Sequence, residues 1–419
     1  MNDSEQQGNN LDHWLDAYAD RAQTLAVSEV RALFSVVSRP EVVSLAGGMP
    51  FVSALPQELL QQTYEGMMSK RGALAMQYGS GQGDPVLRDQ IRDLMALEGI
   101  TSSIEDIVIT TGSQHGLDLL SGLFLDLGDV VLAEGPSYVG ALGIFNHYEA
   151  HVEHVYTDEA GISPEALSEA IDRMKAQGRK IKFLYLVTNF ANPSGVTLSA
   201  ERRPQILEIC RREHILVLED NPYGLLYFDK PVPDALRSMD EEGVIYLGSF
   251  SKILVPGFRV GYVLAPPAIR DKLVLANESA ILCPTSFGQM MISEYLSTAD
   301  WQGQIDTFRG VYRERRDAAL SAMQEYLPKL ETTRPDGGFY LWVTLPEGID
   351  SKAMLPLAVK ELVAYTPGTA FYGDGTGQNK LRICYSYPTP ENINVGIKRL
   401  ANVINLQTEL LETFSKKGS

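Results

Sequence analysis

The sequence predicts an α/β fold in which a mostly parallel mixed sheet lies between two layers of helices, with a smaller α+β domain beside it. First, short apolar runs follow one another at residues 107–111, 130–133, 183–187, 215–218, 244–247 and 260–264. Second, helix-like stretches separate the earlier runs, at residues 114–125, 164–176 and 200–213. Near-continuous apolar strands that alternate with helices are typical of a parallel sheet covered on both faces.

The segments before and after this alternation predict further elements. Near the N-terminus two helices are expected, one from the spacing of Leu11, Trp14, Leu15 and Tyr18 and one from Val30, Leu33, Phe34 and Val37, ended by Pro40. Beyond residue 285 the pattern becomes helical and then mixed. Residues 337–343 are predicted to form a turn followed by a strand, and residues 381–385 a second strand. A last helix is predicted to begin at Thr389-Pro390, where proline follows an N-cap residue.

Composition indicates an ordinary soluble enzyme. The chain has 419 residues, of which 44% are hydrophobic and 21% charged, and no apolar run is long enough for a membrane span. The polar N-terminus lacks a basic start followed by an apolar core, so we expect a cytoplasmic protein. A net charge of −17 disfavours nucleic acid and anionic membranes as partners. Cys210, Cys283 and Cys384 contain no CxxC pair, so no metal site is expected.

Lys252 is the first candidate for chemistry. Taken alone, a lysine is most often a solvated surface charge. Here, however, Ser249 and Ser251 precede it and Arg259 follows, directly after an apolar run. Arginine together with hydroxyl donors suits a phosphate dianion. A lysine beside such a site can form an imine with an aldehyde carried on that phosphate.

Asp220 and Tyr223 lie at the end of the preceding apolar run. An aspartate in this position is commonly a turn former or an N-cap. A carboxylate can also hold the nitrogen of a pyridine ring protonated, so that the ring accepts electrons. A phenol three residues later can hydrogen-bond the hydroxyl group of the same ring.

Two further strand ends carry polar residues. The segment from Asn189 to Gly195 contains Asn192-Pro193, which usually marks only a turn but can also direct an amide at a ligand. Ser113 and Gln114 follow Thr110-Thr111-Gly112 at the start of a predicted helix. Free N–H groups at a helix N-terminus bind phosphate, although a glycine followed by a hydroxyl residue is also a routine helix start.

The motifs TGSQ, NPSG, EDNPY, SFSK and PGFRVGY, in this order, resemble the class I/II aminotransferases of pyridoxal 5′-phosphate (PLP) fold-type I. The chain is most similar to the branch that contains 2-aminoadipate and kynurenine-type aminotransferases and the aminotransferase domain of MocR-like regulators. The resemblance covers nearly the whole chain from about residue 40. It implies an N-terminal arm with part of the small domain at 1–55, a large PLP-binding domain at 56–300 and a small C-terminal domain at 301–419. Ser194 replaces the more frequent threonine after Asn-Pro, which leaves the subfamily open.

The resemblance also implies roles for matching residues. Lys252 would be the Schiff-base lysine and proton shuttle, Asp220 the partner of the pyridine nitrogen, and Asn192 and Tyr223 the contacts of the ring hydroxyl. Tyr138 would stack on the ring. The phosphate cup would consist of Ser113, Gln114, Ser249, Ser251 and Arg259, with Tyr78 from the neighbouring subunit of a homodimer that shares its active sites. The substrate carboxylate would bind Arg382, with Gly47 and Asn189 completing that site.

The expected function is therefore PLP-dependent transfer of an amino group between an L-amino acid (aromatic, aliphatic or 2-aminoadipate-like) and a 2-oxo acid, with 2-oxoglutarate as the expected acceptor. The cofactor motifs leave open a PLP-dependent lyase that eliminates a β-substituent. They also leave open a sensory module that binds PLP without turnover, or a catalytically idle α/β protein. MocR-like regulators carry an N-terminal DNA-binding domain, for which we expect too few residues before the match.

Overall fold

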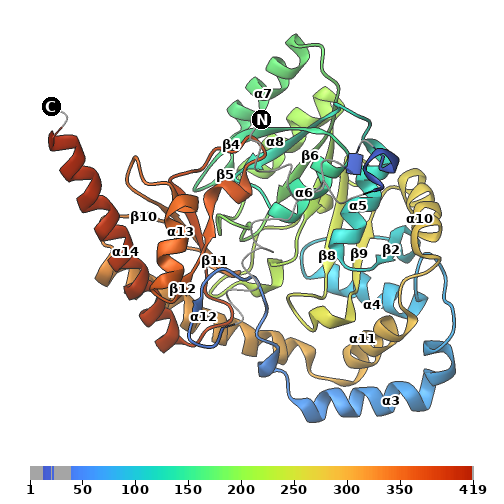
Figure 1. Cartoon of the computed structure of the whole chain (residues 1–419). Coiled ribbons are helices and arrows are strands. Elements are labelled where there is room, and N and C mark those ends of the chain that lie inside the picture. Colours follow the sequence, from blue (N-terminus) through green and yellow to red (C-terminus); the bar gives the residue numbers. More distant parts are fainter. Residues whose placement is uncertain (1–12, 20, 23–38, 418–419) are drawn as a thin grey trace.

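The computed structural model describes residues 13–19, 21–22 and 39–417 (Figure 1). The helix predicted from Val30, Leu33, Phe34 and Val37 lies outside the described residues, and so does Leu11. Of the first predicted helix, the structure shows a single 3-10 turn, η2 (Leu15–Ala17).

A large sheet of eight strands forms the centre of the molecule, in the order β2-β9-β8-β7-β6-β3-β4-β5. The strands β3 (Val130–Gly135), β4 (His151–Asp158), β6 (Ile181–Val187), β7 (Leu216–Asp220) and β8 (Val244–Ser249) pair in parallel. Strand β9 (Gly261–Leu264) is antiparallel to both of its neighbours, β8 and β2 (Ile107–Thr110), and β5 (Gly161–Ile162) is antiparallel to β4. All six predicted runs are strands of this sheet, so the predicted mostly parallel mixed sheet is confirmed.

Helices cover both faces of the large sheet, because its strands alternate between two cores. Val130, Leu132, Leu184, Val217 and Val244 belong to a core with residues of α7 (Pro164–Ala176) and α8 (Arg202–Glu213). The residues next to them in sequence, such as Val131, Tyr185, Leu218 and Ile245, belong to a larger core with residues of α4 (Pro85–Ala96), α5 (Ser113–Phe124) and α6 (Val139–His147). Successive side chains of a strand point to opposite faces, so an apolar run without alternation fills both cores.

Strand β4 was missed by the sequence analysis. Its sequence, HVEHVYTD, contains charged and polar residues, and only Val155 among its eight residues is buried. The strand lies between β3 and the two-residue β5 near one end of the sheet, where its faces are only partly covered. A search for apolar runs finds strands buried on both faces and passes over such a strand.

The smaller domain contains an antiparallel sheet in the order β10-β11-β14-β13 (Figure 1, orange and red). Its strands are β10 (Glu331–Thr332), β11 (Tyr340–Thr344), β13 (Thr366–Pro367) and β14 (Lys380–Cys384). The helices α12 (Trp301–Tyr326), α13 (Ser351–Lys360) and α14 (Pro390–Lys417) lie beside this sheet. Strand β1 (Val43–Ser44) pairs in parallel with β12 (Val363–Ala364), so the N-terminal segment joins this domain. The boundaries after residues 55 and 300 stay a prediction.

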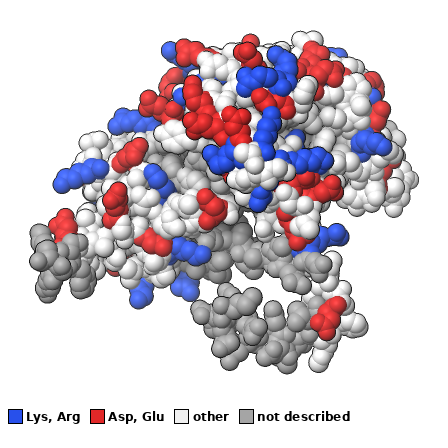
Figure 2. All heavy atoms as spheres, turned by 90° about the horizontal axis from the view of Figure 1, so that it is seen from above, with Lys and Arg blue, Asp and Glu red and all other residues white. Residues whose placement is uncertain are grey.

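The remaining helices lie around the large sheet. They are α3 (Gln57–Ala75), α9 (Leu236–Met239), α10 (Pro267–Ile281) and α11 (Ser286–Thr298), with α3 packed along α11 at the bottom of Figure 1. Short 3-10 turns are η4 (Val52–Ala54), η5 (Ile104–Asp106), η6 (Gly224–Leu226), η7 (Pro256–Phe258) and η8 (Gly368–Phe371). Within the described residues, no helix has the length and apolar character that crossing a membrane requires. On the face shown in Figure 2, acidic and basic side chains are interspersed.

Candidate active site

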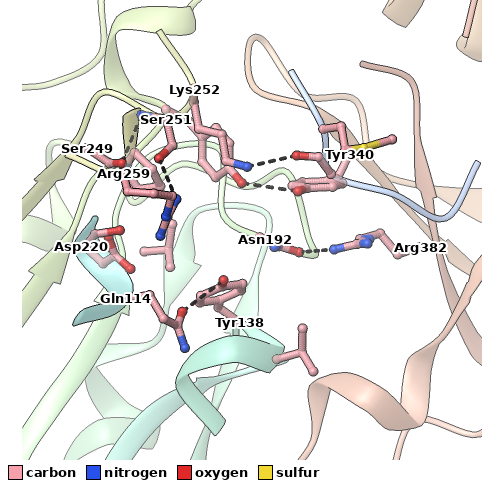
Figure 3. Close-up of a pocket in the computed structure, with 17 residues that line it drawn as sticks. Gln114, Tyr138, Asn192, Asp220, Ser249, Ser251, Lys252, Arg259, Tyr340 and Arg382 are labelled. Atoms are coloured by element: carbon pink, nitrogen blue, oxygen red, sulfur yellow. Dashed lines mark hydrogen bonds between the residues drawn. The ribbon is translucent and has the colours of Figure 1, made fainter. Parts of the chain in front are cut away.

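A cavity of about 310 Å³ lies at the carboxyl ends of β6, β7 and β8, where the large sheet meets the smaller domain (Figure 3). Eleven of the fourteen predicted site residues line it: Ser113, Gln114, Tyr138, Asn192, Asp220, Tyr223, Ser249, Ser251, Lys252, Arg259 and Arg382. The others in the lining are Gly48, Met49, Val139, Val187, Pro222 and Tyr340. Ligands of open α/β sheets bind outside the carboxyl ends of the strands, so the position of the cavity follows from the topology.

Lys252 projects its amine into this cavity from the segment after β8. Its Nζ donates a hydrogen bond to the carbonyl oxygen of Gly48 at 2.9 Å and lies 5.8 Å from the centre of the Phe339 ring. Burial lowers the pKa of Lys252 to about 8, and Arg382 and Arg259 add to this effect, while Cys384 and Asp220 oppose it. A lowered pKa increases the fraction of neutral amine at neutral pH, which is the nucleophilic and basic form.

Asp220 ends β7 on the cavity side of the sheet. Its Oδ2 accepts a hydrogen bond from the Tyr185 hydroxyl at 2.8 Å. Its Oδ1 is buried and has no hydrogen-bond partner among the described residues. Burial raises the pKa of Asp220 to about 6, against the opposing effects of the Tyr185 hydrogen bond and the Lys252 charge. A buried acceptor without a donor is costly, so this oxygen is suited to an N–H group brought by a ligand.

One end of the cavity provides donors for an anion. Helix α5 begins at Ser113 after Gly112, whose φ of 81° places it in the left-handed region, and the free N–H groups of its first turn favour an anion. The guanidinium of Arg259 makes hydrogen bonds of 3.4–3.5 Å to Ser251 Oγ and to two carbonyl oxygens. These bonds are long, so its donors can turn to a ligand. Ser249 Oγ accepts from the Ser251 N–H at 3.1 Å, which orders the same loop.

Arg382 on β14 lies at the opposite side of the cavity and is buried. Its Nη1 donates to Asn192 Oδ1 at 2.6 Å, and its Nη2 donates to the Ala46 carbonyl at 2.6 Å and to Thr366 Oγ1 at 3.2 Å. Its Nε has no hydrogen-bond partner in the part of the chain that the structure describes. An arginine fixed in this way, with an unused donor, is suited to bind a carboxylate.

Tyr340 is a cavity residue that the sequence analysis missed. The Arg382 guanidinium lies 4.4 Å from the centre of its ring, and its hydroxyl lies 3.2 Å from that of Tyr223. A Cβ at Gly48 would lie 2.3 Å from the same hydroxyl, so this approach requires glycine. The sequence signal was available in the Gly-Gly-Phe-Tyr segment that was interpreted only as a turn followed by a strand. Across the cavity, the Tyr138 hydroxyl donates to Gln114 Oε1 at 3.2 Å.

Three predicted residues do not line the cavity. Gly47 does not, whereas its neighbours Gly48 and Met49 do. Asn189 is fully buried, donates to Asn221 Oδ1 at 3.0 Å and accepts from Arg203 at 2.7 Å. The cavity lining therefore gives no support to a carboxylate site completed by Gly47 and Asn189. Tyr78 is 76% exposed on the loop after α3.

Comparison with known proteins agrees with this geometry. Residues 46–400 match the family model described as aminotransferase class I and II. The chain belongs to the class I and II aminotransferases. Enzymes of this family use PLP, so the predicted fold, enzyme class and cofactor are confirmed.

Three similar proteins illustrate the relationship. The aromatic-amino-acid aminotransferase 1 of Thermococcus litoralis is 38% identical over 390 residues, which are 92% of this chain and 94% of that protein. The 2-aminoadipate transaminase of Thermus thermophilus is 34% identical over 93% of this chain and 97% of its own. The crystal structure of the kynurenine aminotransferase of Pyrococcus horikoshii, in complex with PMP, superposes with a TM-score of 0.89 at 39% identity, covering 93% of this chain and 97% of that one.

The residues of the cavity fit PLP. The unpartnered Oδ1 of Asp220 matches a protonated ring nitrogen, which would give this oxygen the donor that the described residues do not supply. The start of α5, Ser249, Ser251 and Arg259 together match a phosphate group. Lys252 would then provide the amine for the aldehyde.

Proposed function

We propose that this aminotransferase moves an amino group between an L-amino acid with an aromatic, aliphatic or 2-aminoadipate-like side chain and a 2-oxo acid, with 2-oxoglutarate as acceptor. The arrangement that carries the proposal is one cavity in which the Lys252 amine lies among the Asp220 carboxylate, the anion-binding end and the Arg382 guanidinium. The names of the three relatives above refer to aromatic amino acids, 2-aminoadipate and kynurenine, and they support the aromatic and 2-aminoadipate-like classes.

When bound, PLP supplies an aldehyde that condenses with an amine and a ring that takes up the electrons released at the substrate α-carbon. Arg382 binds the α-carboxylate of the amino acid and so fixes which bond of the α-carbon faces Lys252. Lys252 Nζ, as neutral amine, would remove the α-proton, and the ammonium group formed in this way would hold the proton for its return. The Asp220 carboxylate would stabilise positive charge at the ring nitrogen, and Tyr223 and Asn192 would hold the ring hydroxyl by hydrogen bonds.

The test uses purified holoenzyme, a panel of L-amino acids and 2-oxoglutarate. We expect glutamate to form together with the 2-oxo acid of the donor, and Lys252→Ala to abolish this turnover. The exposed Lys272→Ala is the matched control and should retain it. If β-substituted amino acids release a 2-oxo acid and ammonia and no glutamate forms, the result would instead support the lyase alternative.

We further propose a cytoplasmic homodimer with shared active sites. The last turn of α3 and the loop after it expose Leu74, Met76 and Tyr78, by 58%, 65% and 76%, and exposed apolar groups of this size are suited to a second copy of the chain. Three free cysteines, with no disulfide among the described residues, support a reducing compartment.

Subunit mixing tests the shared site. If Tyr78 reaches the partner's cavity, a hybrid of Lys252→Ala and Tyr78→Ala subunits contains one site with both defects and one intact site. Mixing two weakly active variants should then restore up to about a quarter of the wild-type activity in a symmetric dimer. Activity that never exceeds the mean of the two variants would contradict a shared site.

A further inference from the structure

The hydrogen bond between Tyr185 and Asp220 crosses two neighbouring strands beneath the cavity. In the register of β6 and β7, Tyr185 lies opposite Leu218 and Val187 lies opposite Asp220. These four side chains therefore lie on one face of the sheet, and Tyr185 lies two residues before the position on β6 that is opposite Asp220. The phenol reaches forward and donates to Asp220 Oδ2 at 2.8 Å, and both residues are buried.

Packing fixes the Tyr185 ring. The residue is fully buried, and the Phe145 ring of α6 lies 5.5 Å from it at 75°, an edge-to-face contact. On its other side β3 pairs with β6, with Ala133 opposite Tyr185. A ring enclosed in this way presents its hydroxyl in one place, and so the hydrogen bond determines which oxygen of Asp220 remains available for another partner.

The two oxygens of Asp220 consequently differ. Oδ2 has the phenol as its donor, whereas Oδ1 is buried and has no partner among the described residues. A buried carboxylate can avoid the cost of its charge either by binding a proton or by pairing with a cation, and the two outcomes exclude each other. The phenol favours the ionised form because it is a donor and not an acceptor at this position.

We propose that Tyr185 is a positioning residue that fixes Asp220 with Oδ1 toward the nitrogen of the cofactor ring and keeps this carboxylate ionised. The inference rests on the proposed pairing of Asp220 with the ring nitrogen and concerns the residue that makes the pairing effective. Tyr185 acts only through Asp220, because it does not line the cavity.

The other titratable groups near Asp220 agree with this role. Lys252 favours the ionised carboxylate. Glu134 on β3 is buried and accepts a hydrogen bond from the Val187 N–H at 2.8 Å. Burial and the charge of Asp220 raise the pKa of Glu134 to about 8, so it is neutral at pH 7 and does not repel Asp220 as a second anion. Burial and the same charge raise the pKa of Tyr138 to about 12, so its phenol is neutral as well.

Tyr185→Phe tests the proposal, since it removes the hydroxyl and leaves the ring. Holoenzyme is prepared with PLP labelled with ¹⁵N in the ring, and the ¹⁵N chemical shift is followed against pH, together with the dissociation constant for PLP. In the variant we expect the ring nitrogen to lose its proton at lower pH than in the wild type. We also expect PLP to bind roughly 10- to 100-fold more weakly, as for loss of a hydrogen bond to a charged group.

Tyr365→Phe is the matched control. This tyrosine is also fully buried, but its hydroxyl donates to the Ser351 carbonyl and it does not line the cavity. It should lower the stability without changing the ¹⁵N titration or the affinity for PLP. Should Tyr185→Phe not fold, Tyr185→3-fluorotyrosine keeps the shape with a stronger donor, and it should change the pH at which the ring nitrogen loses its proton.

Asp220→Asn separates the two assignments. A large ¹⁵N change in Asp220→Asn without any change in Tyr185→Phe would overturn the role of Tyr185 and leave the pairing of Asp220 intact. The absence of a change in Tyr185→3-fluorotyrosine would have the same meaning. No ¹⁵N change in Asp220→Asn would remove the pairing itself, and the role of Tyr185 with it.

Discussion

Asn192 accepts a hydrogen bond from Arg382 across the boundary between the two sheets, at 2.6 Å from amide oxygen to Nη1. Asn192 follows β6 of the large sheet, and Arg382 lies on β14 of the small one. The second nitrogen, Nη2, donates to the Ala46 carbonyl near β1. Three segments far apart in the sequence thus orient one guanidinium before any substrate binds, which is the arrangement that a precise carboxylate site requires.

Arg382→Lys should therefore be a severe change although it keeps the charge. Lysine lacks the planar fork, so it cannot serve Asn192, Ala46 and a carboxylate together. We expect kcat/KM for amino acids to fall roughly 10- to 100-fold or more, the cost of one or two charge-assisted hydrogen bonds. Steady-state kinetics measure this effect. Arg399→Lys, at a half-buried arginine of α14 that also donates to carbonyl groups, should have near wild-type kinetics. An equal loss in that variant would contradict a specific role of Arg382.

Lys252 should capture PLP with a pH dependence that reflects its lowered pKa. Only the neutral amine attacks an aldehyde, so the rate of covalent capture by the apoprotein should rise with pH and reach half of its maximum near pH 8. Stopped-flow absorbance measures the covalent phase, which should be absent in Lys252→Ala. A rate that still increases tenfold per pH unit up to the ordinary lysine value of about 10.4 would show that the cavity does not lower this pKa.

Gly112→Ala should weaken the binding of PLP. A Cβ at this position would lie 2.6 Å from Nη2 of Arg259, so the guanidinium must move away from the anion-binding end. Gly128→Ala is the matched control, because Gly128 has a similar φ of 79° but nothing within 4 Å of its Cβ position. Both variants should lose about 1–3 kcal/mol of stability from backbone strain. Equilibrium dialysis should show a lower affinity for PLP in Gly112→Ala alone.

Glu98 should make the stability depend on pH. It is buried behind the active site and accepts hydrogen bonds from Asn221 and Tyr246, while burial raises its pKa to about 7. The folded state then keeps a proton that the unfolded state releases above about pH 4.5, so this residue's contribution to stability falls as the pH rises from about 4.5 to 7. The total fall is of the order of 3 kcal/mol.

Glu98→Gln removes this titration. From pH 5 to pH 8 the variant should gain stability relative to the wild type, as measured by denaturant unfolding at both values. Glu58→Gln, at an exposed position of α3, should show no such relative gain. If the difference between wild type and Glu98→Gln is the same at both pH values, Glu98 is not protonated in the folded state.

The candidate site was predictable where its residues are next to strand ends in the sequence. Ser113, Asn192, Asp220 and Lys252 each follow an apolar run, and parallel strands bring their carboxyl ends to one edge of the sheet. Asn189 shows the limit of this reasoning. It follows β6 as Asn192 does, but its amide contacts Asn221 and Arg203 and not the cavity. The direction of a side chain in a loop depends on its φ/ψ values and on its neighbours, which spacing does not reveal.

The sequence by itself predicted six of the eight strands of the large sheet and the cofactor, and it points to Lys252 as the amine proposed to receive that cofactor. These features are local: a strand buried on both faces is apolar along its length, and a phosphate site needs donors within a few residues. Only the tertiary structure decided that Asn192 meets Arg382, that Tyr340 joins the cavity and that Tyr185 holds one oxygen of Asp220. These contacts join residues on different strands, or on different sheets, and depend on strand register and on how the small domain packs. Neither the strand register nor the packing of the small domain can be recognised from neighbouring residues in the sequence. A side chain that contacts a distant partner has the same spacing along its strand as one that does not.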